Sequence, residues 1–213
     1  MEYSPIPAFS YGFLTPFYDF AVNLVGFGIK QRHKIVDLLK IRSGENLLDV
    51  GCGTGSLLLV AKKTYPDNEM VGIDVDPEVL EITSKKLKKN SLDVKLINTS
   101  AAKLPFNDSS FDIVVSTLIF HHLPTEIKLQ ALQEIHRVLK KDGRFLLVDF
   151  GKLGMWLKLI YWLGVIFRVP EAKTAKDNVE GKIPIFLKEA DFKLQEVSKR
   201  YRGVDYILAR KES

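Results

Sequence analysis

The segment NLLDVGCGTG, residues 46–55, decides how the rest of this 213-residue chain is interpreted. Its apolar letters are typical of a short buried strand, and the apolar residues 57–61 that follow are typical of a helix start. Gly51, Gly53 and Gly55 remove Cβ atoms where the chain turns sharply and where a ligand can approach the backbone. We therefore predict a strand, a tight ligand-binding turn and a helix N-terminus. A glycine-rich loop without a ligand is the alternative.

Two cofactor classes suit such a loop. The dinucleotide fingerprint G-x-G-x-x-G would need glycine at position 56, where the chain has Ser56. The third glycine comes one residue earlier, and the pattern D-V-G-C-G-T-G resembles motif I of the class I S-adenosylmethionine-dependent methyltransferases. The resemblance implies that S-adenosyl-L-methionine binds here and that S-adenosyl-L-homocysteine leaves.

Other segments carry the same resemblance. LPF at 104–106 with SFD at 110–112, and EI at 134–135 with RVLK at 137–140, are similar to segments of the same family. Together the matches cover about residues 35–150 and resemble most the ubiquinone/menaquinone-biosynthesis (methyltransferase type 11) group. The resemblance fades beyond Phe150, where we expect acceptor specificity to lie.

Strand-like and helix-like segments alternate along the middle of the chain. We expect strands at 69–74, 92–97, 111–117 and 144–150, and helices at 77–90 and 125–140. Such alternation predicts a parallel sheet with helices on both faces. Two β-rich runs, 192–201 and 204–210, are separated by two residues and must pair antiparallel. With the resemblance, this predicts a Rossmann-like, doubly wound α/β fold whose seven-stranded sheet is mostly parallel, with the last strand antiparallel.

We expect a single domain with four parts: a helical, aromatic N-terminal cover (1–40), a cofactor-binding core (41–150), a lid or acceptor-binding insertion (151–185) and a C-terminal hairpin (186–213). The cover contains eight aromatic side chains before residue 29. It is either a hydrophobic cover for the sheet edge or a lid over the ligands. We expect a mixture, with Tyr11 and Tyr18 nearest to the cofactor. Residues 18–40 predict one or two helices, closed by Ser43-Gly44.

Charge and cysteine content exclude some functions. The net charge of +5 is too diffuse to indicate nucleic-acid binding, since Lys85, Lys86, Lys88 and Lys89 suit the solvated face of one helix. Cys52 is the only cysteine, which excludes disulfides and cysteine-built metal sites. We expect no metal, and because the chain has no disulfide we expect a location in the reducing cytoplasm. No charged-then-apolar secretion signal opens the chain.

The resemblance assigns cofactor contacts to the glycines, to Cys52 and to two carboxylates. Asp74 ends the second strand at the edge where such sheets bind ligands, and it can accept hydrogen bonds from both ribose hydroxyls. Asp76 is better explained as a helix cap. Asp49 either orients the loop backbone or faces the methionine amino group through water. Val75 would contact the adenine ring.

The adenine end departs from the family pattern. Many relatives have an acidic residue four positions before the leucine of LPF, where this chain has Ser100. Its hydroxyl can accept the adenine amino hydrogen without a charge, and the Ala101 amide is available to a ring nitrogen. Ser116 and Thr117, at the end of the fourth strand, would lie beside the methionine portion.

Two histidines follow the fourth strand in the loop that faces the acceptor. His122 is the candidate general base and His121 a candidate acceptor contact; the alternative is that both are structural. Residues 116–119 read STLI and lack the N/D-P-P-Y/F segment used for amino groups of nucleic-acid bases, so base methylation is disfavoured.

The run LGMWLKLIYWLGVIFRV, residues 153–169, is apolar nearly all round but too short for a comfortable membrane span of about 20 residues. It is either a buried or dimer-interface helix, or a lid whose Trp156 and Trp162 line an apolar acceptor pocket or touch a membrane surface. We expect Pro170 to end it and residues 171–182 to form a mobile hinge. The acceptor would then be a small apolar or amphipathic molecule, such as a quinone precursor or lipid, and the protein a monomer or homodimer.

These observations together predict in-line methyl transfer to an O, N or C atom. Positioning of the reactants can supply about 7–11 kcal/mol of the barrier. The alternatives are a cofactor-binding protein of this fold without catalysis and a nicotinamide oxidoreductase.

Overall fold

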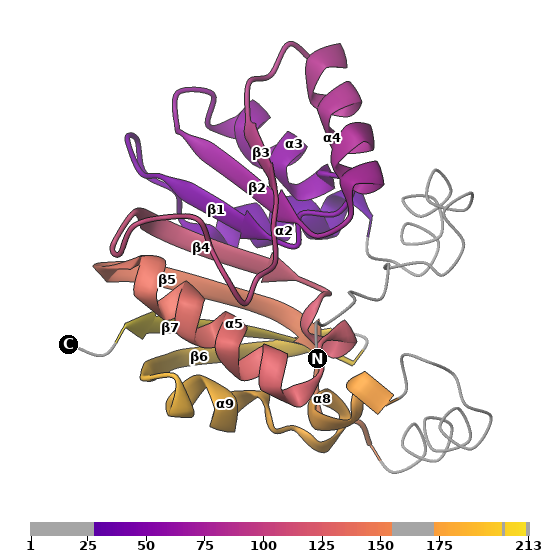
Figure 1. Cartoon of the computed structure of the whole chain (residues 1–213), viewed down its shortest axis with the longest axis vertical. Coiled ribbons are helices and arrows are strands. Elements are labelled where there is room, and N and C mark those ends of the chain that lie inside the picture. Colours follow the sequence, from indigo (N-terminus) through magenta and orange to yellow (C-terminus); the bar gives the residue numbers. More distant parts are fainter. Residues whose placement is uncertain (1–27, 155–172, 202, 212–213) are drawn as a thin grey trace.

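The computed structural model describes residues 28–154, 173–201 and 203–211 (Figure 1). The lid region from 155 to 172 and most of the N-terminal cover therefore fall outside these ranges. So do five residues singled out by the sequence: Tyr11, Tyr18, Trp156, Trp162 and Pro170.

In the described part of the chain, seven strands form one sheet in the order β3-β2-β1-β4-β5-β7-β6. Neighbouring strands from β3 to β5 are parallel, and β7 is antiparallel to both β5 and β6. The predicted doubly wound α/β fold, mostly parallel with an antiparallel last strand, is confirmed. The strands are β1 Leu47–Val50, β2 Met70–Asp74, β3 Lys95–Asn98, β4 Phe111–Thr117, β5 Leu139–Phe150, β6 Phe192–Tyr201 and β7 Val204–Lys211.

Helices cover both faces of this sheet (Figure 1). Helices α5 and α9 pack on one face, and α2, α3 and α4 pack on the other. In β4, Val114 joins the first core, whereas Ile113 and Val115 join the second, because successive side chains of a strand point to opposite faces. The helices are α2 Ile29–Leu39, α3 Ser56–Thr64, α4 Pro77–Lys89, the short η2 Phe120–His122, α5 Thr125–Val138, α8 Lys176–Glu180 and α9 Ile183–Glu189.

The strand order places a ligand crevice beside β1. The chain builds β1, β2 and β3 outward in one direction and then returns to place β4 on the other side of β1. At such a switch point the loops that leave adjacent strands diverge and leave a crevice at their carboxyl ends. The glycine turn after β1 and the loop after β4 flank this crevice.

The LPF segment is held by polar side chains of α5. Arg137 donates hydrogen bonds to the carbonyl oxygens of Leu104 (3.0 Å) and Phe106 (2.8 Å). Glu134 accepts from the Leu104 amide (2.7 Å) and from the Arg137 guanidinium (2.7 Å to its Nε). These contacts give a physical reason why the LPF and E-I-H-R segments occur together in one chain.

Helix α2 ends before Ser43-Gly44, which corrects the predicted boundary. Lys40 takes the left-handed conformation (φ 48°), and its amide donates to the Asp37 carbonyl. Arg144 then donates to the carbonyl oxygens of Leu39 (2.5 Å) and Lys40 (2.7 Å). Arg144 of β5 thus hydrogen-bonds to the carbonyl oxygens at the end of α2. The sequence had predicted that the nearby Ser43-Gly44 would end the helix.

Helix α5 ends at Val138 rather than Lys140. Leu139 already pairs with Phe111 as the first residue of β5, and the Ser110 amide donates to the Val138 carbonyl (2.8 Å). The loop before β4 therefore takes a carbonyl that a longer helix would have used.

Strand β3 begins at Lys95 rather than Leu92. The Leu92 amide donates to the Leu87 carbonyl (3.1 Å), so residues 90–92 complete the end of α4 instead of opening a strand.

The predicted hinge at 171–182 is wrong over its described residues. Helix α8 lies there, and the Asp177 side chain is buried. Asp177 accepts hydrogen bonds from the Thr125 hydroxyl (2.6 Å) and from the buried Lys128 ammonium (3.3 Å). These bonds fasten the segment to the start of α5.

Candidate functional site

The glycine turn has the backbone geometry that the sequence predicted. Gly51, Gly53 and Gly55 all have positive φ (73°, 51° and 69°), which side chains with a Cβ rarely adopt. A Cβ at Gly51 would collide with Ile119, and one at Gly55 with Thr83. A Cβ at Gly53 would meet nothing within 4 Å. The backbone at Gly53 is therefore the part of the turn that a ligand can approach.

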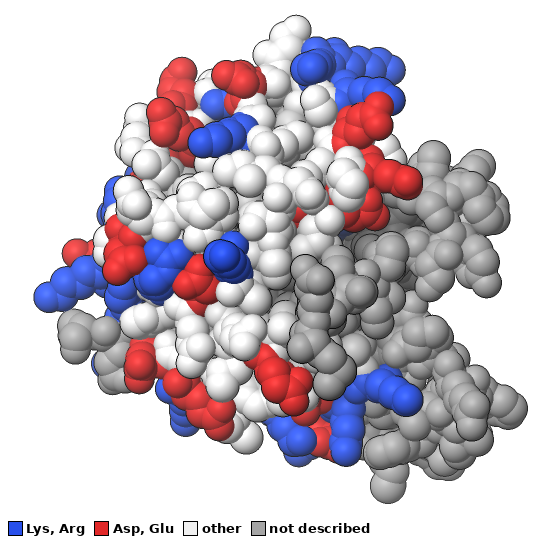
Figure 2. All heavy atoms as spheres, viewed as in Figure 1, with Lys and Arg blue, Asp and Glu red and all other residues white. Residues whose placement is uncertain are grey.

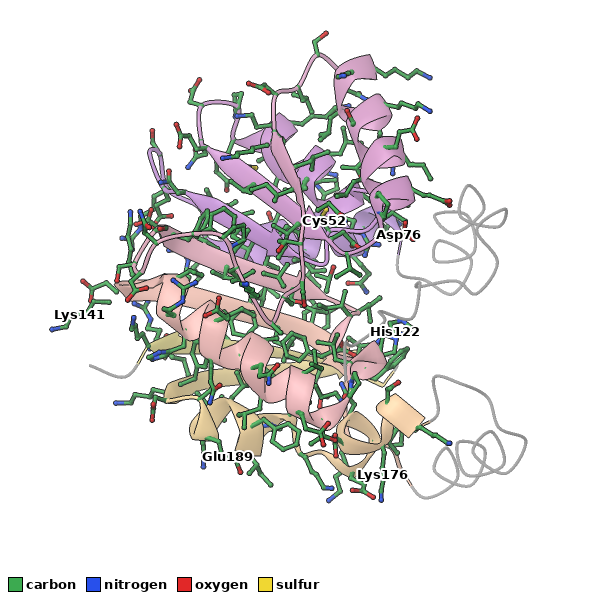
Figure 3. All side chains as sticks on the ribbon, in the orientation of Figure 1. Cys52, Asp76, His122, Lys141, Lys176 and Glu189 are labelled. Carbon is green, nitrogen blue, oxygen red and sulfur yellow. The ribbon has the colours of Figure 1, made fainter. Side chains whose placement is uncertain are left out.

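A pocket opens over this turn, at the carboxyl ends of β1, β2 and β4. Figure 3 shows Cys52, Asp76 and His122 along this edge of the sheet. Six of the predicted site residues line the pocket: Gly51, Cys52, Gly53, Asp74, Thr117 and His122. Eight further residues line it: Arg32, Thr54, Ser56, Leu57, Asp76, Val79, Leu118 and Ile119.

Asp74 faces the pocket and also holds the turn. Its carboxylate accepts hydrogen bonds from the amides of Gly53 (2.9 Å) and Asp76 (3.1 Å). Burial raises the pKa of Asp74, and these amide bonds oppose that shift. Asp76 caps α4 as predicted, accepting from the Glu78 amide (2.9 Å), and it lines the pocket as well.

Asp49 is fully buried beside the pocket residues, and neither of its carboxylate oxygens has a hydrogen-bond partner in the described structure. Burial raises its pKa to about 7; the positive charge of Arg32 lowers this value, and the Asp74 carboxylate raises it. Asp49 therefore does not orient the loop through hydrogen bonds. Asp49 is not among the residues that line the pocket, so its ligand-facing role stays a prediction.

Arg32, on α2, is a pocket residue that the sequence interpretation missed. Its side chain is 9% exposed. The signal lay in its spacing: Arg32 occupies the same helix face as the buried Ile35, Val36 and Leu39. A cation within an apolar stripe indicates a specific partner, because burying an unpaired charge is costly.

The end of β4 contributes backbone as well as side chains. The Ser116 hydroxyl is buried and donates to the Val50 carbonyl (2.9 Å), so this side chain fastens β4 to β1 rather than reaching the pocket. Thr117 does line the pocket. Leu118 follows with φ 58°, a value rare for a bulky residue, and its strained backbone forms part of the pocket wall.

His121 is not among the residues that line the pocket, and its predicted role in acceptor binding stays a prediction. Its Nδ1 lies 2.8 Å from Asp149, a buried carboxylate at the end of β5. The same carboxylate accepts the amide of Phe120 (2.7 Å), and the His121 ring packs edge-on against Phe150 (4.7 Å between centroids). His121 thus anchors the loop after β4.

His122 does line the pocket, but its environment makes it a weak base. Burial, with a smaller contribution from the neighbouring charge of His121, lowers its pKa to about 4. An efficient general base has a pKa near the working pH. The ring is therefore neutral at pH 7 and accepts a proton reluctantly.

The predicted adenine contacts are only partly brought together. The predicted adenine contacts Val75, Ser100 and Ala101 are not among the residues that line the pocket, and neither is Gly55 of the glycine turn. The Ser100 hydroxyl accepts a hydrogen bond from the Ala102 amide (3.2 Å), and its second lone pair stays available as an acceptor. Asp76 and Val79 form this end of the pocket instead, and sequence reasoning had assigned Asp76 only as a cap.

Charges of both signs are interspersed on the face shown in Figure 2, over the described elements. The ion pair between Lys85 and Glu81 (2.6 Å) is one example of this mixture on α4. Within the described ranges, no helix has the length and apolarity needed to cross a bilayer. The same residues contain no group of three His, Cys, Asp or Glu placed to share a metal ion.

Comparison with known proteins adds a sequence relationship. Residues 47–143 match the family described as "Methyltransferase domain". A demethylmenaquinone methyltransferase from Thermus thermophilus is 34% identical over 139 residues, which are 64% of this chain and 62% of that protein. The chain thus matches less than two thirds of this relative's length.

Solved structures share the fold. A SAM-dependent methyltransferase from Aquifex aeolicus superposes with a TM-score of 0.73 at 21% identity, covering 93% of this chain and 97% of that one. The [4+2]-cyclase SpnF superposes with a TM-score of 0.71 at 17% identity, covering 94% and 93%. Since a cyclase shares the architecture, the fold alone does not decide the reaction.

Proposed function

We propose that this protein transfers a methyl group from S-adenosyl-L-methionine to a small apolar or amphipathic acceptor. The match of residues 47–143 to a methyltransferase domain and the similarity to a demethylmenaquinone methyltransferase support the proposal. The observation that carries the proposal is the glycine turn. Its outermost residue, Gly53, leaves open space over the backbone, and buried charges lie beside that space.

The residues present suit this cofactor. Asp74 faces the pocket at the end of β2, where its remaining lone pairs would accept the ribose hydroxyls. The unpartnered Asp49 carboxylate would favour the amino group of the methionine portion through water. The turn from Gly51 to Gly53 would let the cofactor approach the backbone closely.

When bound, the sulfonium supplies an electrophilic methyl group that is already reactive. The protein's contribution is then to bind, orient and exclude water, and holding reactants in line can lower a barrier by about 7–11 kcal/mol. Thr117, Leu118 and Ile119 form the wall between the glycine turn and His122, and so shape the acceptor side. With its lowered pKa, His122 contributes shape and a neutral ring rather than strong basicity.

We further propose a quinone-type acceptor. The demethylmenaquinone methyltransferase similarity supports this class, as does the apolar run at 153–169. That run is proposed to contact the acceptor and, peripherally, a membrane surface, in a monomer or homodimer in the cytoplasm.

The test combines binding with turnover. Calorimetric titration with S-adenosylhomocysteine, and separately with NAD, distinguishes the proposed cofactor from a nicotinamide. Turnover is then followed as adenosylhomocysteine formation with a reduced naphthoquinone carrying a short isoprenoid tail, and with a single-stranded oligonucleotide as control. Failure to bind S-adenosylhomocysteine would overturn the proposal. Binding without turnover on any acceptor of the apolar class would favour a non-catalytic cofactor-binding protein.

A further inference from the structure

The Arg32 guanidinium stands apart from the other buried cations of the described structure. Arg144 bonds to Glu45 (2.6 Å) and Lys128 to Asp177 (3.3 Å), so each has a carboxylate partner. Arg32 is about as buried as Arg144 (9% and 8% exposed), yet its side chain forms no hydrogen bond or ion pair with any residue in the described ranges. It faces the pocket over the glycine turn instead.

Helix α2 holds Arg32 firmly in this place. The Tyr206 hydroxyl donates to the neighbouring Gln31 (3.0 Å), and Arg144 bonds to the carbonyl oxygens that end the helix. Because α2 is fixed on both sides of Arg32, the cation is a built part of the pocket wall. A cation held at the pocket wall with no partner among the described residues is a group that a bound anion would stabilise.

Asp49 complements Arg32. The two charges are close enough for Arg32 to lower the pKa of Asp49, but they form no ion pair within 4.0 Å. One unpaired cation and one unpaired anion beside the same turn match a zwitterion, whose carboxylate and ammonium groups lie on one carbon. The amino-acid end of the proposed cofactor has this chemistry.

We infer that Arg32 binds the α-carboxylate of the cofactor's methionine portion and thereby selects a carboxylate-bearing cofactor over its decarboxylated form. The inference rests on the proposed cofactor. A guanidinium presents two parallel N–H donors to a carboxylate, a geometry that a lysine does not reproduce. Arg32 is thus a positioning and specificity residue, which fixes one end of the cofactor while Asp74 fixes the other.

The test compares two ligands that differ by one group: S-adenosylhomocysteine and its decarboxylated analogue, titrated by calorimetry. The wild-type protein should bind the first at least 10-fold more tightly. Arg32→Met should weaken S-adenosylhomocysteine about 10- to 100-fold, the loss expected for charge-assisted hydrogen bonds, while changing affinity for the analogue less than threefold. Lys30→Met, at an exposed position of the same helix, is the matched control and should change neither.

Thermal unfolding of the ligand-free proteins gives an independent measurement. Arg32→Met should be as stable as the wild type or more stable, since it removes an unpaired buried charge. If Arg32→Met fails to fold, two other measurements test the inference. The first is the ratio of the wild-type protein's affinities for the two ligands. The second is the same ratio in Arg32→Lys, which should lose most of the preference for S-adenosylhomocysteine. Equal weakening of both ligands, or no wild-type preference, would overturn the inference while the proposed function stands. If the wild type binds neither ligand, the proposed function falls and the inference with it.

Discussion

The main-chain amide of Gly53 donates a 2.9 Å hydrogen bond to Oδ2 of Asp74. The residue proposed to hold the cofactor's ribose therefore also holds the turn over which the cofactor binds. Binding and local order are therefore coupled at this carboxylate, for which the sequence predicted only the ligand contact.

Asp74→Ala should weaken S-adenosylhomocysteine binding about 10- to 100-fold in a calorimetric titration. It should also lower the free energy of unfolding by roughly 1–3 kcal/mol, because the amides of Gly53 and Asp76 lose their acceptor. Unchanged affinity would remove Asp74 from the cofactor site. Asp74→Asn, which keeps one acceptor oxygen, should lose less stability than Asp74→Ala.

Asp49 should make the ligand-free protein less stable as the pH rises from about 4 to about 7. Its folded-state pKa of about 7 lies above the ordinary value of 3.8, so the folded protein binds the extra proton across this window. Stability is fully present below the unfolded pKa and is lost as pH rises toward the folded one, by an amount on the order of a few kcal/mol. Urea unfolding of wild type and Asp49→Asn at pH 4.5, 6 and 7.5 checks this.

The readout for Asp49 is the difference between the two proteins, because Glu45, Asp112 and Asp177 have lowered pKa values and give the opposite slope. Asp49→Asn should become progressively more stable relative to the wild type as pH rises. A difference that does not change with pH would show that Asp49 is not buried as a carboxylate without partners.

His122→Asn should lower turnover less than threefold and leave cofactor affinity unchanged. The reason is that a ring with a pKa of about 4 is a poor proton acceptor at pH 7. Initial rates at saturating cofactor measure this, with His33→Asn, at an exposed position of α2, as control. A loss of 10²-fold or more with intact cofactor binding would instead identify His122 as a general base.

Arg137→Met should destabilise the fold by roughly 2–3 kcal/mol, since the carbonyls of Leu104 and Phe106 lose a shared charged donor. Arg137→Lys should recover little of the lost stability, because one ammonium group cannot reproduce the planar set of N–H donors of a guanidinium. Lys141→Met, at an exposed position just after α5, should leave the urea midpoint unchanged. Equal midpoints for wild type and Arg137→Met would show that the LPF segment is held by packing alone.

Trp156→Ala and Trp162→Ala, made separately, should raise the acceptor KM while leaving S-adenosylhomocysteine affinity nearly untouched. This prediction rests on the sequence of residues 153–169 alone. Steady-state kinetics test it, and light scattering reports any change of oligomeric state. If both variants unfold, or dissociate a dimer with normal kinetics, the segment is structural and the acceptor pocket lies elsewhere.

Local patterns predicted the parts of this fold that depend on local physics. Strand β4 was predicted to the residue because a fully apolar run between polar loops has one stable environment, the sheet centre. The hairpin of β6 and β7 followed from a connection too short for any other pairing. The glycine turn was predicted because its three positive φ angles leave glycine as the residue that fits.

Contacts distant in sequence account for what was missed. Arg144 binds the Lys40 carbonyl at the end of α2, and Asp149 holds His121 in the loop after β4. Neither the helix end nor the position of the histidine could therefore be predicted from the residues next to it in the sequence. Arg32 was overlooked because the sequence does not show whether a buried cation has a polar partner. The structure shows that Arg32 has none among the described residues and that it lines the pocket.

The hydrogen bonds that Arg144 and Tyr206 form with α2 come from residues that are synthesised long after the helix. Arg144 bonds to a carbonyl 105 residues earlier in the chain, and Tyr206 reaches Gln31 across 175 residues. The glycine turn is synthesised before either of these residues, and α2 can already pack on α3 at that stage. The two hydrogen bonds that fix the position of α2, and with it Arg32 on the pocket wall, can form only once β5 and β7 have been made. Substitutions in β5 or β7 can therefore alter the pocket although neither strand contributes a residue to its lining.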